Sequence, residues 1–253
     1  MEINKEELLQ VALKAVFEAK IISLKVSHDF NILSSYYKDI KTQVDIEMND
    51  VIISCLKSTG IPILSEERGG ENLGNVFWIV DPLDGTLNFT RGFDCYSISI
   101  SLWMNDTPQL GVVYDIVKNR VYTSKNNNGA WEGEKKIQVS TTNKIQEAIL
   151  ATGFPSGANY HTEILLSIVA KIQIFKKIRA IGSASLMLSL VASGVFDVYY
   201  EKDIYLWDVA AGLSLVKEAG GEYLIRKTSN DYKYEVLATN GFLFQECKNI
   251  LFN

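Results

Sequence analysis

The pattern of apolar residues changes near residue 148, and this change limits the folds open to the chain. Before it, short apolar runs such as "VFWIV" at 76–80 and "YSISISLW" at 96–103 predict strands. After it, strand-like runs alternate with helical patterns, as in "KIRAI" followed by "SASLMLSLVAS". We therefore predict an α+β fold in two subdomains: residues 1–147, with an antiparallel sheet flanked by helices, and residues 148–253, with layered α/β structure.

Helical periodicity precedes the first strands. Apolar residues recur at spacings of three and four over residues 9–24, which places them on one helix face. A second helical pattern covers residues 46 to about 58, with Asp45 at its start and Gly60 and Pro62 beyond its end. The acidic residue at this helix start becomes important below.

Charge and cysteine content exclude several classes of protein. The net charge of −5 argues against a nucleic-acid-binding surface, which needs clustered lysine and arginine. Cys55, Cys95 and Cys247 are widely spaced, so they indicate neither a disulfide framework nor a thiolate metal site. The first residues, "MEINKEELLQ", lack the features of a secretion signal, and no stretch has the apolar length of a membrane span. A cytoplasmic protein without membrane contact is expected.

The segment "VDPLDGTLNF" at 80–89 places two carboxylates, Asp81 and Asp84, three positions apart after an apolar run. In isolation this sequence is typical of a plain turn. An EF-hand loop is excluded because the twelfth position from Asp81 is Gly92. A phospho-aspartate mechanism needs D-x-D-G-T, and the extra residue here displaces the nucleophile. Walker A, G-x-G-x-x-G, H-E-x-x-H and C-x-x-C motifs are absent, and the chain has only two histidines.

Further acids stand at the ends of other predicted elements. Glu66 and Glu67 follow the apolar run "PIL", and Asp208 begins a helical pattern, as Asp45 does. Hard oxygen ligands of this kind suit Mg²⁺. The competing interpretations are that Asp45 and Asp208 are helix N-caps, and that Glu66 and Glu67 are solvated loop acids. For Glu67 we keep the solvated interpretation.

Together, "WIVDPLDGTLNF", "LSEE" and "WDVAAGLSLVKEAGG" resemble the inositol monophosphatase family of the lithium-sensitive, magnesium-dependent phosphatases. The resemblance covers Lys38 to about Gly221. It implies a layered α-β-α-β-α sandwich of the inositol monophosphatase and fructose-1,6-bisphosphatase type. The chain departs from the family pattern at Leu87, where many members have a second threonine, and at Val44, where a small or polar residue is usual.

The resemblance implies a site for two to three Mg²⁺ ions. Glu66, Asp81 and the Leu83 carbonyl would hold the first ion, and Asp81, Asp84 and Asp208 the second. A third, looser ion would contact Glu66 and mostly water. Two cations between Asp81 and Asp84 would turn the repulsion of these carboxylates into attraction.

The resemblance also implies the reaction, an in-line attack on the phosphoryl group by a water molecule that the metal activates. Thr86 would hydrogen-bond this water, Asp45 would orient Thr86 and take part in proton removal, and Glu66 would lie against the same water. The backbone N–H groups of Gly85 and Thr86, at the start of a helix, would bind the substrate phosphate.

The substrate expected from the resemblance is inositol monophosphate or a related polyol phosphate. Gly182, Ser183 and Ala184 would line the sugar pocket together with Asp208, and Glu201 would accept hydrogen bonds from hydroxyl groups. A helix start at Gly182 and Ser183, and an edge-strand position for Glu201, are the structural alternatives. Neighbouring cations leave a second phosphate site open: Lys176, Lys177, Arg179 and Lys202.

Three functions therefore remain in view. The first is an inositol-phosphate phosphatase that is sensitive to lithium and, by resemblance, a homodimer, with a small phosphate monoester as its binding partner. The second is a fructose-1,6-bisphosphatase or nucleotide 3′-phosphatase on the same scaffold. The third is a regulatory binding protein with residual phosphatase activity.

Overall fold

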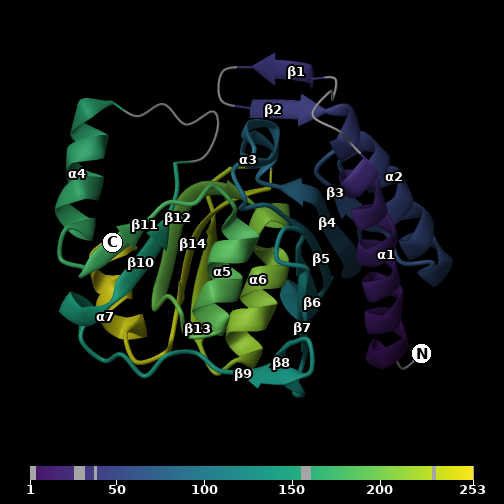
Figure 1. Ribbon diagram of the computed structural model, residues 1–253. Helices are drawn as coiled ribbons and strands as arrows, with labels where there is room; N and C mark the ends of the chain where they lie inside the picture. Colours follow the sequence, from purple (N-terminus) through teal and green to yellow (C-terminus); the bar gives the residue numbers. More distant parts are fainter. Residues whose placement is uncertain (1–3, 26–31, 37–38, 155–160, 230–231, 253) are drawn as a thin grey trace.

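The computed structural model of the chain describes residues 4–25, 32–36, 39–154, 161–229 and 232–252. Within these residues, two large sheets and three layers of helices alternate (Figure 1). A separate two-stranded hairpin, β1 (Ile32–Tyr36) and β2 (Asp39–Thr42), lies above the short helix α3 (Thr86–Arg91).

The first large sheet is mostly antiparallel and has seven strands in sequential order. Only β3 runs parallel to its neighbour β4. The strands are β3 (Ile63–Ser65), β4 (Val76–Asp84), β5 (Ser97–Met104), β6 (Thr107–Asp115), β7 (Arg120–Lys125), β8 (Gly129–Glu132) and β9 (Lys135–Ile137). Sequential hairpins of this kind follow from the short polar turns between the strands.

The second sheet is mixed and has five strands in the order β11-β10-β12-β14-β13. Strand β10 pairs in parallel with β11 and β12, whereas β14 pairs antiparallel with β12 and β13. The strands are β10 (Ile149–Thr152), β11 (Lys177–Arg179), β12 (Val198–Tyr205), β13 (Glu222–Lys227) and β14 (Lys233–Thr239). The parallel pairs require the helical crossovers that the alternating pattern predicts.

The helices form the remaining layers, as Figure 1 shows. Helices α1 (Lys5–Lys25) and α2 (Gln43–Leu56) cover the outer face of the first sheet. Helices α5 (Ala184–Ala192) and α6 (Leu206–Glu218) fill the space between the two sheets, and α4 (Thr162–Ile172) and α7 (Phe244–Leu251) cover the outer face of the second. Single 3₁₀ turns occur at Lys57–Thr59 and Ile145–Glu147. This α-β-α-β-α arrangement confirms the predicted fold class.

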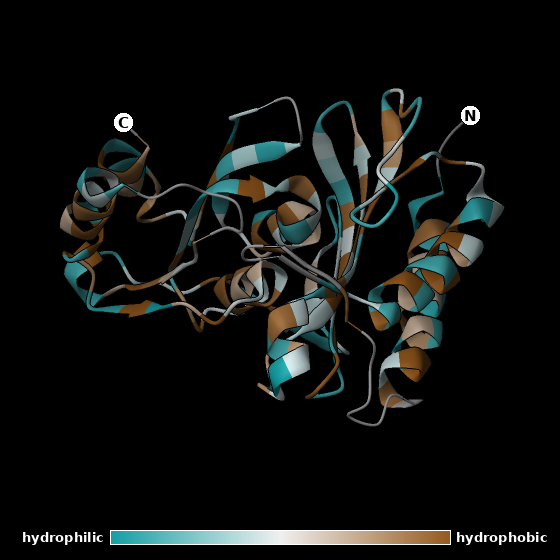
Figure 2. Cartoon of the chain, turned by 90° about the horizontal axis from the view of Figure 1, so that it is seen from above, coloured by the Kyte–Doolittle hydropathy of each residue, from teal (hydrophilic) through white to brown (hydrophobic). Residues whose placement is uncertain are grey.

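Strand alternation assigns side chains to separate apolar cores. In β4, Trp78 and Val80 face α1 and α2, whereas Phe77 and Ile79 face α5 and α6. A third core lies between the second sheet and its outer helices. Figure 2 shows hydrophobic residues on both the central and the outer helices. Because both faces of these sheets are covered, the cores anchor the strand ends that carry the acidic residues.

Several elements were not predicted from the sequence. The hairpin β1–β2 is rich in polar residues, and β14 is a nearly continuous buried run rather than an alternating one. Strand β4 extends to Asp84, four residues beyond the predicted end. No helix in the described part of the chain is long and apolar enough to cross a bilayer.

Candidate metal centre

A β-bulge at the end of β4 explains the D-x-x-D spacing. Asp81 pairs with Ser99 of β5 and Asp84 pairs with Ser97, so three steps along β4 match two along β5. In a regular strand, residues three apart point to opposite faces. The extra residue in the bulge, beside Pro82, which has no N–H to pair, brings both carboxylates to the same face.

The bulge and helix α6 together create a cluster of three carboxylates. Asp81, Asp84 and Asp208 have ligand oxygens that all lie within 4.8 Å of one another. Asp81 and Asp84 are buried, and Asp208 is partly buried. Burial, and then the charges of Glu66 and the neighbouring aspartates, raise the pKa of Asp81 and of Asp208 well above the usual range. Glu66 therefore lies close enough to act on the same cluster.

The donor set of this cluster fits Mg²⁺. In the described residues, no lysine, arginine or histidine forms an ion pair with Asp81, Asp84 or Asp208. Adjacent buried carboxylates without a cationic partner repel one another, and a hard cation with oxygen ligands removes that cost. Of the residues that the family resemblance assigns to the metal, the fold brings Asp81, Asp84 and Asp208 together, and the charge of Glu66 acts on them.

Asp84 also connects the two halves of the chain. Its Oδ2 accepts hydrogen bonds from the Ser183 hydroxyl at 2.6 Å, and from the Ser185 hydroxyl at 2.6 Å and backbone N–H at 2.8 Å. The Ala184 N–H approaches Oδ1 at 3.3 Å. Burial raises the pKa of Asp84, although these hydrogen bonds oppose that rise. The start of α5 therefore orients a carboxylate of β4, a role for Ser185 that sequence reasoning missed.

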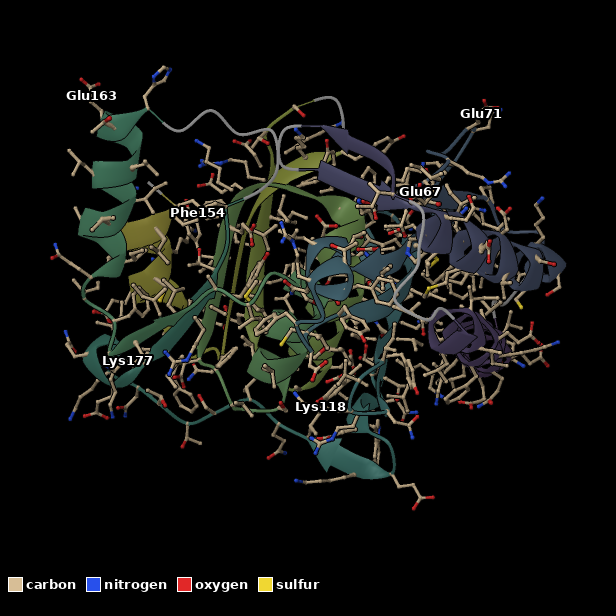
Figure 3. The ribbon with its side chains drawn as sticks, turned by 45° about the horizontal axis from the view of Figure 1, so that its top comes forward. Glu67, Glu71, Lys118, Phe154, Glu163 and Lys177 are labelled. Carbon is tan, nitrogen blue, oxygen red and sulfur yellow. The ribbon has the colours of Figure 1, made fainter. Side chains whose placement is uncertain are left out.

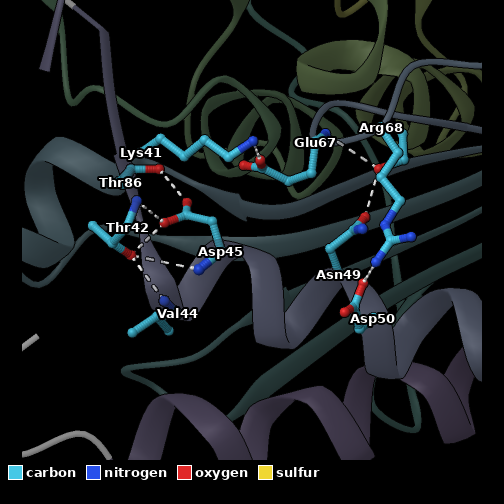
Figure 4. A network of polar contacts seen from close by, with 10 residues as sticks. Lys41, Thr42, Val44, Asp45, Asn49, Asp50, Glu67, Arg68 and Thr86 are labelled. Carbon is cyan, nitrogen blue, oxygen red and sulfur yellow. Dashed lines mark hydrogen bonds and ion pairs between the residues drawn. The ribbon is translucent and has the colours of Figure 1, made fainter. Parts of the chain in front are cut away.

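Asp45 and Thr86 form a second polar pair. The Thr86 hydroxyl lies 2.9 Å from Asp45 Oδ1 and 3.0 Å from the Leu83 carbonyl oxygen. The Thr42 N–H donates to Asp45 Oδ2 at 2.8 Å, and its hydroxyl contacts the same oxygen. Burial raises the pKa of Asp45, while hydrogen bonds from Thr42 and Thr86 lower it. Asp45 is therefore fixed in place, with one oxygen directed to Thr86 (Figure 4).

The interpretation of Asp45 and Asp208 as helix N-caps is wrong in its detail. Thr42 is the N-cap of α2, and Asp45 is the third residue of that helix, which reaches back to the Thr42 N–H. Asp208 is likewise the third residue of α6, and its Oδ2 accepts from the Tyr205 N–H at 3.2 Å. Each aspartate therefore uses one oxygen for its helix and keeps the other for its neighbours.

The turn at Gly85 and the turn at Gly182 lie side by side. Both glycines have positive φ angles, +95° and +73°, which a residue with a side chain rarely adopts. A Cβ at Gly85 would also lie 2.9 Å from the Cys95 carbonyl oxygen. Asn88 of α3 joins the turns, because its Nδ2 donates to the carbonyls of Cys95 and Ile181, both at 2.7 Å.

Glu201 is not an edge-strand residue, as one alternative held. It lies in β12, between β10 and β14, and is 5% exposed. Tyr199 donates a hydrogen bond to its Oε2 at 2.8 Å. Burial raises the pKa of Glu201 to about 7, and the charge of Asp84 adds to the rise. The carboxyl group of Glu201 is therefore close enough to interact electrostatically with Asp84 of the aspartate cluster. The nearby cations Lys176, Lys177, Arg179 and Lys202 are exposed.

Glu67 is not the solvated loop acid that the sequence suggested. Its side chain is 4% exposed and forms an ion pair with Lys41 of β2. Lys41 carried no signal in the sequence, because its partner stands 26 positions away and only the fold brings them together.

The layered α-β-α-β-α fold thus gathers acidic residues where β4 and α6 meet. The chain belongs to the inositol monophosphatase family, whose family model matches residues 4–246.

Known proteins agree with this assignment. The chain is 32% identical to an inositol-1-monophosphatase of Mesorhizobium japonicum over 229 residues, which cover 86% of this chain and 85% of the relative. It is 39% identical to Nus factor SuhB of Xylella fastidiosa over 186 residues, 72% of this chain and 68% of the relative. The crystal structure of the extragenic suppressor protein SuhB of Bartonella henselae matches with a TM-score of 0.86 at 26% identity, covering 97% of this chain and 98% of that one.

Proposed function

We propose that the protein is an Mg²⁺-dependent phosphomonoesterase that hydrolyses inositol monophosphate or a related polyol phosphate. The observation that carries this proposal is the cluster of Asp81, Asp84 and Asp208, with Asp45 and Thr86 hydrogen-bonded nearby. Membership of the inositol monophosphatase family and the name of the Mesorhizobium relative support it.

Two to three Mg²⁺ ions would be held by Glu66, Asp81, Asp84, Asp208 and the Leu83 carbonyl. When bound, Mg²⁺ neutralises phosphoryl oxygens and lowers the pKa of water. Within the described residues, Asp81, Asp84 and Asp208 form no ion pair with a protein cation, which supports this ligand set, because ions would replace the mutual repulsion of these acids with attraction.

The protein's own part in proton movement falls to Asp45 and Thr86. Thr86 Oγ1 would accept a hydrogen bond from the attacking water while it donates to Asp45 Oδ1. Asp45, held by Thr42, would keep Thr86 in that orientation and take up the proton. Glu66 would contact the same water, and the N–H groups of Gly85 and Thr86 would bind the phosphate.

The pocket beyond the phosphate favours a polyol. Glu201 would accept hydrogen bonds from substrate hydroxyls, next to Gly182, Ser183 and Ala184. A buried carboxylate at this place repels a second phosphate group on the substrate. We therefore expect inositol 1-phosphate to have a higher kcat/KM than fructose 1,6-bisphosphate.

A phosphate-release assay with inositol 1-phosphate, fructose 1,6-bisphosphate and a nucleoside 3′-phosphate tests this proposal. Activity is expected with Mg²⁺ and absent in excess chelator. Ca²⁺ is expected to inhibit, because its larger size and looser geometry would not hold the water in line. Full activity in chelator would refute the metal mechanism, and preference for the bisphosphate would refute the polyol assignment. Inhibition by Li⁺ and a homodimer are further expectations from the family.

A binding role is the second candidate, and the name of the Xylella relative, a Nus factor, favours it. Such a role does not need the carboxylate cluster. If the Asp84→Asn variant lacked turnover but still bound the same partner protein as the wild type, the two functions would be separate.

A further inference from the structure

The ion pair between Lys41 and Glu67 joins two segments that flank the carboxylate cluster. Glu67 directly follows Glu66, and its carboxylate pairs with the ammonium group of Lys41 in β2 (Figure 4). The Glu67 side chain is 4% exposed and that of Lys41 is 35% exposed. Figure 3 shows the contrast with Glu71, which points outward at the edge of the molecule.

On the Lys41 side, the next residue holds the proposed proton acceptor. Thr42 donates through its N–H and hydroxyl to Asp45, which in turn accepts from Thr86. The peptide unit between Lys41 and Thr42 therefore links the two side chains, and a shift of the Lys41 backbone would also shift the hydrogen-bond donor of Asp45.

On the Glu67 side, the same turn carries Glu66. Ser65 and Gly69 exchange backbone hydrogen bonds of 3.0 and 2.7 Å across this turn, and the Glu66 N–H donates to Val80 of β4 at 3.1 Å. The Ser65 hydroxyl donates to Asn49 of α2 at 2.5 Å. The backbone of the turn is thus anchored, and the ion pair fixes the direction of its second carboxylate.

The Lys41–Glu67 ion pair limits the negative charge near the carboxylate cluster, and this charge affects how strongly cations bind. Glu66 already raises the pKa of Asp81 and Asp208. A second glutamate beside it would add another negative charge to the same region, but the ammonium group of Lys41 neutralises it. Buried acids beside a cation site either join the site or require their own partner.

We propose that Lys41 is a positioning residue that neutralises Glu67 and holds it out of the cation site, so that Glu66 alone of the adjacent pair serves the ions. This inference rests on the proposed function, since it assumes that Mg²⁺ binds at the cluster. It assigns opposite consequences to the loss of the two partners. Loss of the Lys41 charge makes the net charge of this region more negative by one unit, and loss of the Glu67 charge makes it more positive by one unit.

Calorimetric titration of Mg²⁺ into the wild type and the variants tests the proposal without relying on turnover. Lys41→Met is expected to bind Mg²⁺ about three- to tenfold more tightly, and Glu67→Gln about two- to fivefold more weakly, by the Coulomb effect of one charge. Lys41→Arg is expected to behave as the wild type. The double variant Lys41→Met with Glu67→Gln has the same net charge as the wild type and is expected to return to wild-type affinity.

A matched control lies on the same turn. Arg68 pairs with Asp50 of α2, but both side chains are about half exposed. Arg68→Gln is therefore expected to leave Mg²⁺ affinity unchanged, because water screens this pair.

Turnover gives a second readout. At saturating Mg²⁺, Lys41→Met is expected to lose severalfold in kcat with little change in KM. The reason is that the ion pair connecting the Asp45 segment to the Glu66 segment is then absent. Equal Mg²⁺ affinity in the wild type and Lys41→Met, or shifts of the same sign in Lys41→Met and Glu67→Gln, would overturn the inference. A merely structural role would weaken binding in both variants. If the wild type itself binds no Mg²⁺, the proposed function fails and the inference fails with it.

Discussion

Two groups of buried carboxylates lie on the two sides of the five-stranded sheet, one on β14 of that sheet and one on β4 of the seven-stranded sheet, and they are stabilised in different ways. Glu235 of β14 is 4% exposed, accepts a hydrogen bond from Tyr200 at 2.7 Å, and pairs with Arg226. Arg226 also lies over the Phe252 ring at 4.7 Å. Asp81, 1% exposed on the other side, has other carboxylates as its neighbours.

The comparison shows how to recognise a ligand site among buried acids. Glu235 borders a cavity of about 500 Å³ between the sheet and helices α4 and α7, yet its charge is already balanced by a guanidinium group. A balanced acid needs no ligand, whereas repelling acids without a cation of the protein call for one. Charge balance therefore distinguishes Glu235 from the aspartate cluster, while Glu201 of the proposed polyol pocket also lines this cavity.

The largest expected effect is on turnover at the metal side. Asp84→Asn is expected to lose more than about a hundredfold in kcat, because a positioned charge is lost at the proposed ion site. Circular dichroism is expected to show an intact fold, since asparagine can still accept from Ser183 and Ser185. The exposed Glu71→Gln serves as control. Near-normal turnover in Asp84→Asn would mean that Asp84 is only a turn residue.

On the other face, the expected effect is on stability rather than on catalysis. Arg226→Met is expected to lower the free energy of unfolding by about 1–3 kcal/mol, because it leaves Glu235 buried without its counter-charge. The effect is smaller than for a fully buried pair, since the Arg226 side chain is 57% exposed. Urea denaturation measures the loss, and kcat is expected to stay within about twofold. A loss of kcat like that of Asp84→Asn would show that this face belongs to the active site.

Whereas Arg226→Met is expected to destabilise the protein, a substitution at Asp81 is expected to stabilise it. In metal-free protein, Asp81→Asn is expected to raise the free energy of unfolding by about 1 kcal/mol, because it removes a repelling buried charge while Oδ1 can still accept from the Leu83 N–H. Added Mg²⁺ is expected to stabilise the wild type but not the variant. Destabilisation of the metal-free variant would mean that the acids there are already compensated.

The smallest expected effect concerns Glu201. Glu201→Gln is expected to raise KM for inositol 1-phosphate severalfold with less change in kcat, because the proposed role of Glu201 is to bind the polyol rather than the reacting phosphoryl group. An unchanged KM would remove Glu201 from the pocket.

Glu201 also predicts a pH dependence in the metal-free protein. The folded state keeps the proton up to about pH 7, whereas the unfolded chain releases it near its ordinary pKa of 4.5. The unfolded state therefore binds fewer protons between these values, and this group lowers stability as pH rises through that window. Glu201→Gln cannot ionise, so its stability advantage over the wild type is expected to grow from pH 4.5 to 7 and then to level off. Parallel pH profiles of the two proteins would contradict this.

Sequence patterns predicted the layers and the acids better than their geometry. The alternation of strands with helices and the order of the acidic motifs are local properties of the chain, so they could be interpreted directly. The bulge that brings Asp81 and Asp84 to one face depends on the register with β5, which no local pattern specifies. Glu67 was misjudged for the same reason, because its burial depends on Lys41 of a distant hairpin.

The hydrogen bonds between Asp84 and the start of α5 have a consequence for synthesis of the chain on the ribosome. A nascent chain that has emerged through β9 already contains Glu66, Asp81 and Asp84, but Ser183, Ser185 and Asp208 have yet to be translated. Until then, Asp84 lacks the donors that orient it, and the cluster lacks its third aspartate. With the proposed function, Mg²⁺ would therefore meet a complete site only after both sheets have come together, late in folding.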